Sequence, residues 1–288
     1  MKNTAWLDRT IYPFTSHYFE VNNQQLHFID EGEGETILFV HGTPSWSFDF
    51  RHVIKALRSN YRCVAIDHIG FGLSDKPRAY DYSTTNHAST LEKFIVNRGL
   101  KNITLVAHDF GGPIALSVAI KNPSLFKRLV ILNSWLWSSE SEPEFIKFKR
   151  ILKSPLLPIL YRYFNFSPAY LLPKSFGEKK IDKRMLQNYT RPFSTHQERF
   201  GPLAFAKSLL KDQAWFEELW NTRTSISSLP TLLIWGLKDS FVTEKYLRKF
   251  TQGFSNCKVI EMPGCGHFPQ EEQPDQVISG INKFLSRT

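Results

Sequence analysis

Cysteine is scarce in this sequence, and the three that are present, Cys63, Cys257 and Cys265, form no Cys-x-x-Cys pair. Three scattered cysteines are too few for a disulfide framework or a cysteine-based zinc site, so we expect free thiols and no bound metal. Long hydrophobic runs are also missing, because no segment approaches the ~20 uninterrupted apolar residues of a membrane span. The first fourteen residues include Lys2 and Asp8 and lack the apolar stretch of a secretory signal. We therefore expect a cytoplasmic chain with no membrane span.

Acidic residues are outnumbered, since 36 Lys and Arg stand against 27 Asp and Glu, giving a net charge of +9. Most of this excess lies in residues 138–213, which hold fourteen basic and seven acidic side chains. We interpret it as a solvated helical surface rather than a nucleic-acid-binding one, and we expect no nucleic-acid partner. A positive surface would also favour the entry of an anionic substrate or the exit of an anionic product.

Apolar runs and helical patterns alternate along much of the 288 residues, of which 42% are hydrophobic. Residues 17–21 and 24–30 predict a β-hairpin, and later strands are predicted at 36–40, 62–67, 103–107, 129–132, 231–235 and 257–262. Helices are predicted at 47–57, 84–96, 244–250 and 275–285. Strands such as 36–40 are wholly apolar, which is typical of a parallel sheet buried on both faces. The order predicts an α/β fold with a mostly parallel, doubly wound sheet.

The alternation stops between residue 134 and about residue 225. This stretch has no strand-like run, several prolines and many aromatic side chains. We interpret residues 134–225 as a helical cap inserted after the sixth strand. Residues 1–133 and 226–288 then form the α/β core.

The apolar run 103–107 ends near an acid, Asp109, and two glycines then open a segment with helical spacing. A nucleophile at the tip of such a strand–turn–helix sits in strained backbone and needs small residues two positions before and after it. Ala107 and Gly111 meet that need. We interpret the stretch as a nucleophile elbow in which Asp109 takes the place usually held by serine. The alternative is that Asp109 only caps the next helix.

Two further candidates follow strands, at the sheet edge where ligands bind in such folds. Asp239 comes after strand 231–235, and His267 comes after strand 257–262. The order of nucleophile, acid and histidine is that of the α/β-hydrolase arrangement. Asp239 would hold one nitrogen of His267 and leave the other free to take a proton. His41 and His108 are weaker candidates, because we expect His41 to fix its turn and His108 to point away from Asp109.

An aspartate nucleophile restricts the substrate. Attack by a carboxylate on an ester would give a reactive anhydride, whereas attack on a saturated carbon bearing a leaving group gives an ordinary alkyl ester. His267 would then deprotonate a water that attacks the carboxyl carbon of Asp109. The backbone N–H groups of Thr43 and Phe110 would form the oxyanion hole.

The sequence resembles the haloalkane dehalogenases and the related epoxide hydrolases over almost its whole length. The stretches that match are residues 41–48, 67–77, 191–193, 201–205 and 264–272, together with the elbow. The resemblance implies an α/β-hydrolase fold and a cofactor-independent hydrolase with an Asp109, His267 and Asp239 triad, acting on a small to medium apolar substrate. Asn133 stands where one dehalogenase subgroup has its acid, so the resemblance favours Asp239.

The sequence departs from the dehalogenase pattern at the halide site. Dehalogenases place a tryptophan after the nucleophile and commonly an asparagine or glutamate after His-Gly, whereas this chain has Phe110 and Thr43. A phenylalanine ring has no hydrogen-bond donor, and each missing donor costs ~1–3 kcal/mol. Trp135 and Trp137 are candidate replacements, and Phe268 is a further candidate for the leaving-group pocket.

Three other functions remain open. An epoxide hydrolase would need cap tyrosines to protonate the opening oxygen, and the candidates are Tyr161, Tyr163, Tyr170 and Tyr189. Dehalogenase-like enzymes that open β-lactones use the same acid and histidine. Ligand receptors of this fold bind without turnover, but the intact triad argues against that reading.

Overall fold

The computed structural model describes residues 5–287, apart from the side chain of Glu144. These residues form an eight-stranded sheet in the order β1-β2-β4-β3-β5-β6-β7-β8. The strands are β1 (His17–Val21), β2 (Gln24–Glu31), β3 (Thr36–Val40), β4 (Arg62–Ile66), β5 (Ile103–Asp109), β6 (Phe126–Ser134), β7 (Thr231–Gly236) and β8 (Cys257–Met262). The two pairings of β2 are antiparallel and all others are parallel. The predicted α/β class and mostly parallel sheet are confirmed.

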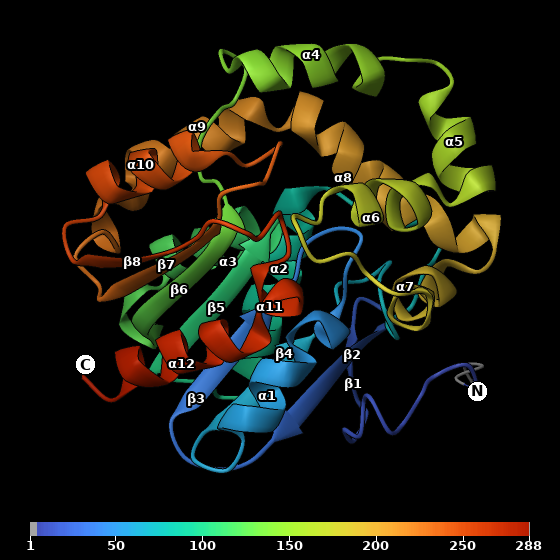
Figure 1. Cartoon of the computed structure of the whole chain (residues 1–288). Helices are drawn as coiled ribbons and strands as arrows, with labels where there is room; N and C mark the ends of the chain where they lie inside the picture. Colours follow the sequence, from blue (N-terminus) through green and yellow to red (C-terminus); the bar gives the residue numbers. More distant parts are fainter. Residues whose placement is uncertain (1–4, 288) are drawn as a thin grey trace.

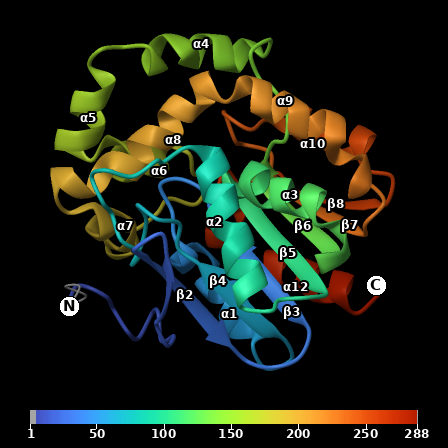
Figure 2. The same ribbon diagram turned by 180° about the vertical axis from the view of Figure 1, so that it is seen from behind.

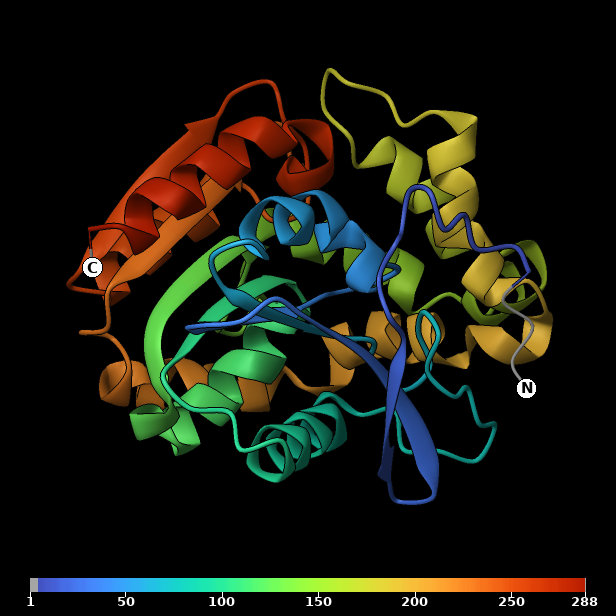
Figure 3. The ribbon, with the colours of Figure 1, turned by 90° about the horizontal axis from the view of Figure 1, so that it is seen from below.

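Helices cover both faces of the sheet, because its central strands are apolar on both sides. α1 (Arg51–Leu57) and α12 (Pro274–Leu285) pack with the side of β3 that carries Ile37 and Phe39. α2 (Thr84–Asn97), α3 (Gly111–Lys121) and α10 (Glu244–Gly253) pack with the side that carries Leu38 and Val40. Figure 3 shows the two layers on opposite sides of the sheet. This burial holds the carboxyl ends of the strands in fixed positions.

The chain between β6 and β7 is helical, and its described residues contain no strand. It carries α4 (Pro143–Leu152), α5 (Leu157–Phe164), α6 (Leu172–Lys174), α7 (Lys183–Thr190), α8 (Phe200–Lys211) and α9 (Gln213–Thr222). We call it the α4–α9 segment. Its helices lie beyond the carboxyl ends of the strands, with α4 and α5 outermost over α8 (Figures 1 and 2). No helix in residues 5–287 is long and apolar enough to cross a membrane.

The elements differ from the predicted ones mainly at their ends. β5 continues two residues past the apolar run, because His108 and Asp109 still pair with β6 in the ladder. The predicted helix 47–57 is split into a 3-10 turn at Ser47–Phe50 and α1. Side-chain polarity marked where the apolar run stopped, whereas backbone hydrogen bonds decide where a strand stops.

Candidate active site

Asp109 stands at the turn between β5 and α3, as the elbow pattern predicts. Its φ is +52°, a left-handed conformation that is unusual for a residue other than glycine. The turn passes close to β3, since a Cβ at Gly111 would lie 2.1 Å from the Val40 carbonyl oxygen. A Cβ at Gly42 would lie 2.0 Å from Oδ1 of Asp109. Glycine at both positions therefore lets the strained turn sit against the neighbouring loop.

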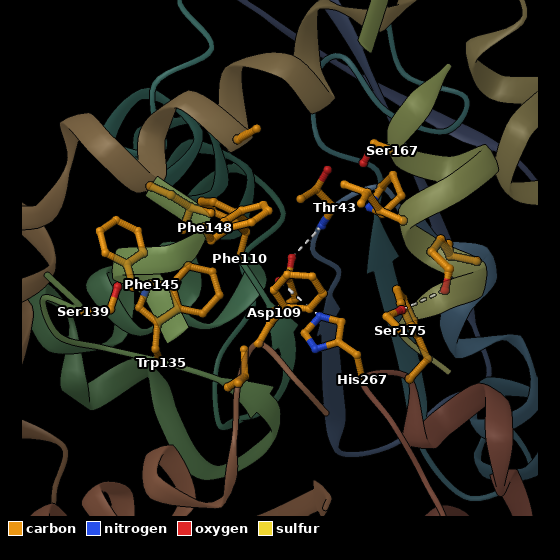
Figure 4. A pocket seen from close by; sticks show the side chains of 18 of the residues that line it. Thr43, Asp109, Phe110, Trp135, Ser139, Phe145, Phe148, Ser167, Ser175 and His267 are labelled. Atoms are coloured by element: carbon orange, nitrogen blue, oxygen red, sulfur yellow. Dashed lines mark hydrogen bonds and ion pairs between the residues drawn. The ribbon is translucent and has the colours of Figure 1, made fainter. Parts of the chain in front are cut away.

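The structure brings Asp109, His267 and Asp239 into direct contact. His267 Nε2 lies 3.2 Å from Asp109 Oδ2, and His267 Nδ1 lies 2.6 Å from Asp239 Oδ2. All three residues are buried. Figure 4 shows the His267 ring turned toward the Asp109 carboxylate. The spatial order of acid, imidazole and acid is the one predicted from their order in the chain.

Asp239 is held by the loop after β7 and by β6. Its Oδ1 accepts hydrogen bonds from the backbone N–H groups of Phe241 and Val242, at 2.8 and 3.1 Å. Its Oδ2 accepts one from the Asn133 side-chain amide at 2.9 Å. Asn133 thus supports the acid rather than replacing it. These bonds fix the carboxylate that orients His267.

His267 carries a proton in this arrangement. Burial lowers the pKa of its imidazole, but the charge of Asp239 and the hydrogen bonds to Asp109 and Asp239 outweigh burial and raise it to about 10. Burial raises the pKa of Asp239, but the charge of His267 and the hydrogen bonds from His267, Phe241 and Val242 together outweigh burial and lower it. An imidazolium between two carboxylates is therefore the resting state at neutral pH.

This pKa predicts how stability depends on pH. The ordinary histidine value is 6.5 and the folded value is about 10, so the folded chain binds this proton more tightly than the unfolded chain. The stabilisation is complete below pH 6.5 and is lost as pH rises to about 10. We expect the unfolding free energy of the parent chain, relative to His267→Gln, to fall across this range in urea titrations. A difference that does not change with pH would contradict the assignment.

The loop after β3 supplies a donor to Asp109. The backbone N–H of Thr43 donates to Asp109 Oδ1 at 2.7 Å, which Figure 4 marks as a dashed line. His41 fixes this turn, because its Nδ1 donates to the Gly42 carbonyl at 2.7 Å while its Nε2 accepts from the His68 N–H at 3.0 Å. One of the two predicted oxyanion-hole donors therefore already contacts the carboxylate.

A cavity of about 140 Å³ opens in front of Asp109 and His267. The cavity is mostly apolar, with Pro44, Phe110, Trp135, Phe145, Phe148, Tyr161, Leu171, Leu172, Ala206, Leu209, Phe241, Val242, Tyr246 and Phe268 in its wall. The few hydroxyl groups come from Thr43, Ser139, Ser167, Ser175, Tyr161 and Tyr246.

Trp135 and Phe268 line this cavity, as expected, but Trp137 does not. Trp137 packs against Trp220, Tyr246 and Phe250, with ring centroids 4.9 to 5.4 Å apart. The prediction that Trp137 belongs to the leaving-group pocket is wrong. Its side chain is buried among the rings of α9 and α10, where the aromatic contacts hold it away from the cavity.

Of the four tyrosines considered for protonating an epoxide oxygen, Tyr161 alone lines the cavity. Tyr163 and Tyr170 are exposed, and Tyr189 is buried with its hydroxyl against Asp49 and Glu271. Tyr246 of α10 also reaches the cavity, and sequence reasoning missed it. Its position on the apolar side of α10 predicts burial, and nothing in the sequence indicates which space it faces.

A second polar cluster lies behind His267. His108 Nε2 donates to the His267 carbonyl at 2.7 Å, so the His108 side chain points away from Asp109, as expected. His108 Nδ1 lies 3.3 Å from the Asp49 carboxylate, which also accepts from Gln270 at 2.7 Å. The cluster therefore supports the backbone of the loop that carries His267.

The same loop is tied to the α4–α9 segment. The His267 N–H donates to the Ser175 carbonyl at 2.8 Å, and the Glu178 N–H donates to the Gly264 carbonyl at 2.9 Å. The Gly177 N–H donates to the Glu272 carboxylate at 2.8 Å. Residues 175–178 and the histidine loop thus form one hydrogen-bonded unit.

Arg51 and Glu271 form a buried ion pair next to this unit, with 1% and 5% of their surfaces exposed. Glu271 accepts from Arg51 at 2.7 Å and from the Tyr189 hydroxyl at 2.8 Å. Removing one partner leaves an unpaired buried charge, so we expect Glu271→Gln to cost about 3–5 kcal/mol in denaturant unfolding. Glu244→Gln, which breaks the exposed pair of Glu244 with Arg248, is the control and should cost below about 0.5 kcal/mol. Equal losses would contradict this assignment.

Comparison with known proteins points to one family. The family described as the alpha/beta hydrolase fold matches residues 35–274. A cis-3-alkyl-4-alkyloxetan-2-one decarboxylase of Shewanella oneidensis is 33% identical over 97% of this chain and 91% of its own length. Haloalkane dehalogenase 2 of Mycobacterium tuberculosis is 32% identical over 95% of this chain and 96% of its own. The solved haloalkane dehalogenase DatA of Agrobacterium tumefaciens C58 superposes with a TM-score of 0.87 at 26% identity, covering 95% of this chain and 96% of its own.

Proposed function

Because the chain belongs to the alpha/beta hydrolase fold family, we propose that it is a haloalkane dehalogenase-like enzyme in which Asp109 forms an alkyl ester with its substrate. The observation that carries the proposal is the position of the Asp109 carboxylate. It lines an apolar cavity, with Thr43 N–H on one oxygen and His267 Nε2 3.2 Å from the other. A carboxylate in this position attacks carbon without first losing a proton.

In the first step a carboxylate oxygen of Asp109 forms a bond to a saturated carbon, and the leaving group departs with the electron pair of its own bond. The resulting ester is neutral. Asp109 then no longer raises the pKa of His267 through its charge, so the imidazolium gives up its proton more readily, to the leaving group or to solvent. Ester formation therefore prepares His267 to act as a base.

In the second step His267 takes a proton from water, and the hydroxide adds to the carboxyl carbon of Asp109. The N–H groups of Thr43 and Phe110 would hold the oxyanion. Collapse of this intermediate expels the alcohol, which takes its proton from His267 and leaves Asp109 as a carboxylic acid. This acid then gives its proton to His267, which restores both the carboxylate and the imidazolium. Residues 134–225 would act as the lid and residues 1–133 and 226–288 as the core.

The residues of the site define the nucleophile more clearly than the leaving group. The Phe110 ring lies edge-on to Trp135 and against Phe205, with ring centroids 4.8 and 4.7 Å apart, and offers no donor to a halide. This favours a second candidate, the opening of a β-lactone, whose leaving group is a carboxylate released by ring strain. The name of the Shewanella relative describes a decarboxylase of such rings.

For a 3,4-dialkyl oxetan-2-one, Asp109 would attack the ring carbon that bears oxygen, and the ring C–O bond would break to give a carboxylate. Loss of carbon dioxide then moves the electron pair of a C–C bond into a C=C bond and expels Asp109 as carboxylate. No water is consumed, and the product is an alkene rather than an alcohol.

A single turnover in ¹⁸O-labelled water tests the covalent mechanism. Water attacks Asp109, so the label is expected in the peptide that contains Asp109, and the first product alcohol keeps unlabelled oxygen. Label in the alcohol of the first turnover would overturn the proposal. If a cis-3,4-dialkyl oxetan-2-one gives an alkene and carbon dioxide and the protein takes up no label, the enzyme opens β-lactones. If chloro-, bromo- and iodoalkanes release no halide, the enzyme is not a dehalogenase.

The role of Phe110 can be tested by adding the missing donor. We expect Phe110→Trp to raise kcat/KM for 1-bromobutane about 5- to 100-fold, because one supplied hydrogen bond contributes ~1–3 kcal/mol. Halide release is the measurement. Phe110→Leu changes the packing without adding a donor and serves as the matched control. The same gain in both variants would show that space, not hydrogen bonding, limits the reaction.

A further inference from the structure

Exposed apolar side chains are concentrated on the outermost part of the α4–α9 segment. Among the described residues eleven large apolar side chains are exposed, and seven of them lie within residues 146–170. These seven are Ile146, Ile151, Leu156, Ile159, Tyr163, Phe164 and Tyr170. Three are at least 60% exposed, Leu156 at 60%, Tyr163 at 61% and Phe164 at 68%. Such a concentration of exposed apolar side chains in one stretch of the chain indicates a binding face.

Helix α5 is apolar on two opposite sides. Leu157 and Tyr161 face inward and are buried in a cluster with α4 and α8. Leu156, Ile159 and Tyr163, at helical spacing, form an outward stripe that is 47% to 61% exposed. The Tyr163 ring stacks on one face against His196, with ring centroids 5.6 Å apart. A helix that is apolar all round is normally buried on every side. The outward stripe therefore leaves apolar surface open to a binding partner.

The stretch of chain that carries this stripe is basic. Residues 145–175 contain six basic side chains and no acidic one. Three of them, Lys147, Arg150 and Lys153, are exposed on or next to α4, beside Ile146 and Ile151, and form no ion pair within the described part of the chain. We define the docking face as Ile146, Lys147, Arg150, Ile151, Lys153, Leu156, Ile159, Tyr163, Phe164 and Tyr170.

We propose that the docking face binds the surface of an anionic lipid bilayer. Leucine, isoleucine and phenylalanine would enter the boundary between headgroups and acyl chains, and tyrosine rings suit the same depth. Lysine and arginine would contact lipid phosphates while their stems lie along the apolar surface. α4 and α5 lie on the outside of the molecule in both views (Figures 1 and 2).

The docking face adjoins the cavity. Phe145 and Phe148, on the inner side of α4, line the cavity wall. Phe148 contacts Phe241, with ring centroids 5.3 Å apart, and Phe241 is 37% exposed while also lining the cavity. The cavity therefore reaches the surface beside α4. An apolar substrate dissolved in the bilayer would enter there without crossing water.

Vesicle flotation with the full chain tests the proposal. We expect the parent chain to float with vesicles of phosphatidylglycerol and phosphatidylcholine and to remain unbound with phosphatidylcholine alone. The variant Lys147→Gln, Arg150→Gln, Lys153→Gln should lose about fivefold in partitioning for each basic residue removed. The variant Leu156→Ser, Ile159→Ser, Phe164→Ser should lose at least about tenfold, because it removes the apolar contact.

Matched controls change similar residues elsewhere on the surface. Val96→Ser with Val259→Ser removes exposed apolar groups, and Lys101→Gln with Lys258→Gln and Lys283→Gln removes three charges. Both controls should float like the parent chain. No flotation, equal binding to neutral vesicles or equal losses in the controls would overturn the proposal. A dimer in light scattering that the serine variant dissociates, without vesicle binding, would assign the face to a second copy instead. The docking residues do not contact Asp109, so these results are independent of the proposed reaction.

Discussion

Asp109→Asn is expected to abolish turnover, with a loss on the order of 10⁴-fold or more in kcat. The amide keeps the shape of the side chain, but its oxygen is neutral and is a poor nucleophile toward saturated carbon. No covalent adduct should appear on the protein with any electrophile. Intact-protein mass spectrometry on freshly prepared variant, together with product assays, is the measurement.

The control for this variant is Asp275→Asn, which removes an acid from the first turn of α12, far from the cavity. It should turn over like the parent chain. An adduct that still forms on Asp109→Asn, or activity within about tenfold of the parent, would show that another group attacks the substrate. In that case the elbow position of residue 109 would have a structural role only.

His267→Gln is expected to separate the two steps. Asp109 needs no base for its attack, so the ester should form, whereas hydrolysis loses its base and should slow by about 10²–10⁴-fold. The protein mass should then rise by one butyl group after exposure to 1-bromobutane, or by the whole molecule after styrene oxide. The trapped adduct identifies the electrophile that this site accepts.

His196→Gln, on an exposed turn, is the control and should accumulate nothing. If His267→Gln forms no adduct with a bromoalkane, an epoxide or a β-lactone, the ester mechanism is wrong. If it turns over at the parent rate, the contact of His267 Nε2 with Asp109 has no part in the reaction.

The strands and the elbow could be predicted from the sequence because the patterns that indicate them are local. An apolar run such as residues 36–40 can be stable only inside a covered sheet, and a turn flanked by Ala107 and Gly111 has few other uses. Asp239 and His267 could be placed near Asp109 because the carboxyl ends of neighbouring parallel strands meet at one edge. The strand order then fixed which loops face each other.

The residues of the cavity wall were harder to predict from the sequence, because the wall depends on packing between distant elements. Trp135 and Trp137 are two residues apart, yet one faces the cavity and the other fills the space beside α10. Likewise, no local pattern tells that Tyr161 faces inward while Tyr163 faces outward until the position of α8 is known. The polar cluster of Asp49, His108 and Gln270 joins residues more than fifty positions apart and leaves no motif.

The hydrogen bonds between residues 175–178 and the histidine loop fix one part of the cavity wall, and α4 supplies another part through Phe145 and Phe148. If a hinge lifted residues 175–178, the bond from the His267 N–H to the Ser175 carbonyl would break and the imidazole would be displaced. Within the described residues no hydrogen bond joins α4 or α5 to the histidine loop, so a shift of these helices would leave the bond between His267 and Ser175 intact. Substrate and product would therefore pass beside α4 while His267 keeps its position relative to Asp109 and Asp239 through each turnover.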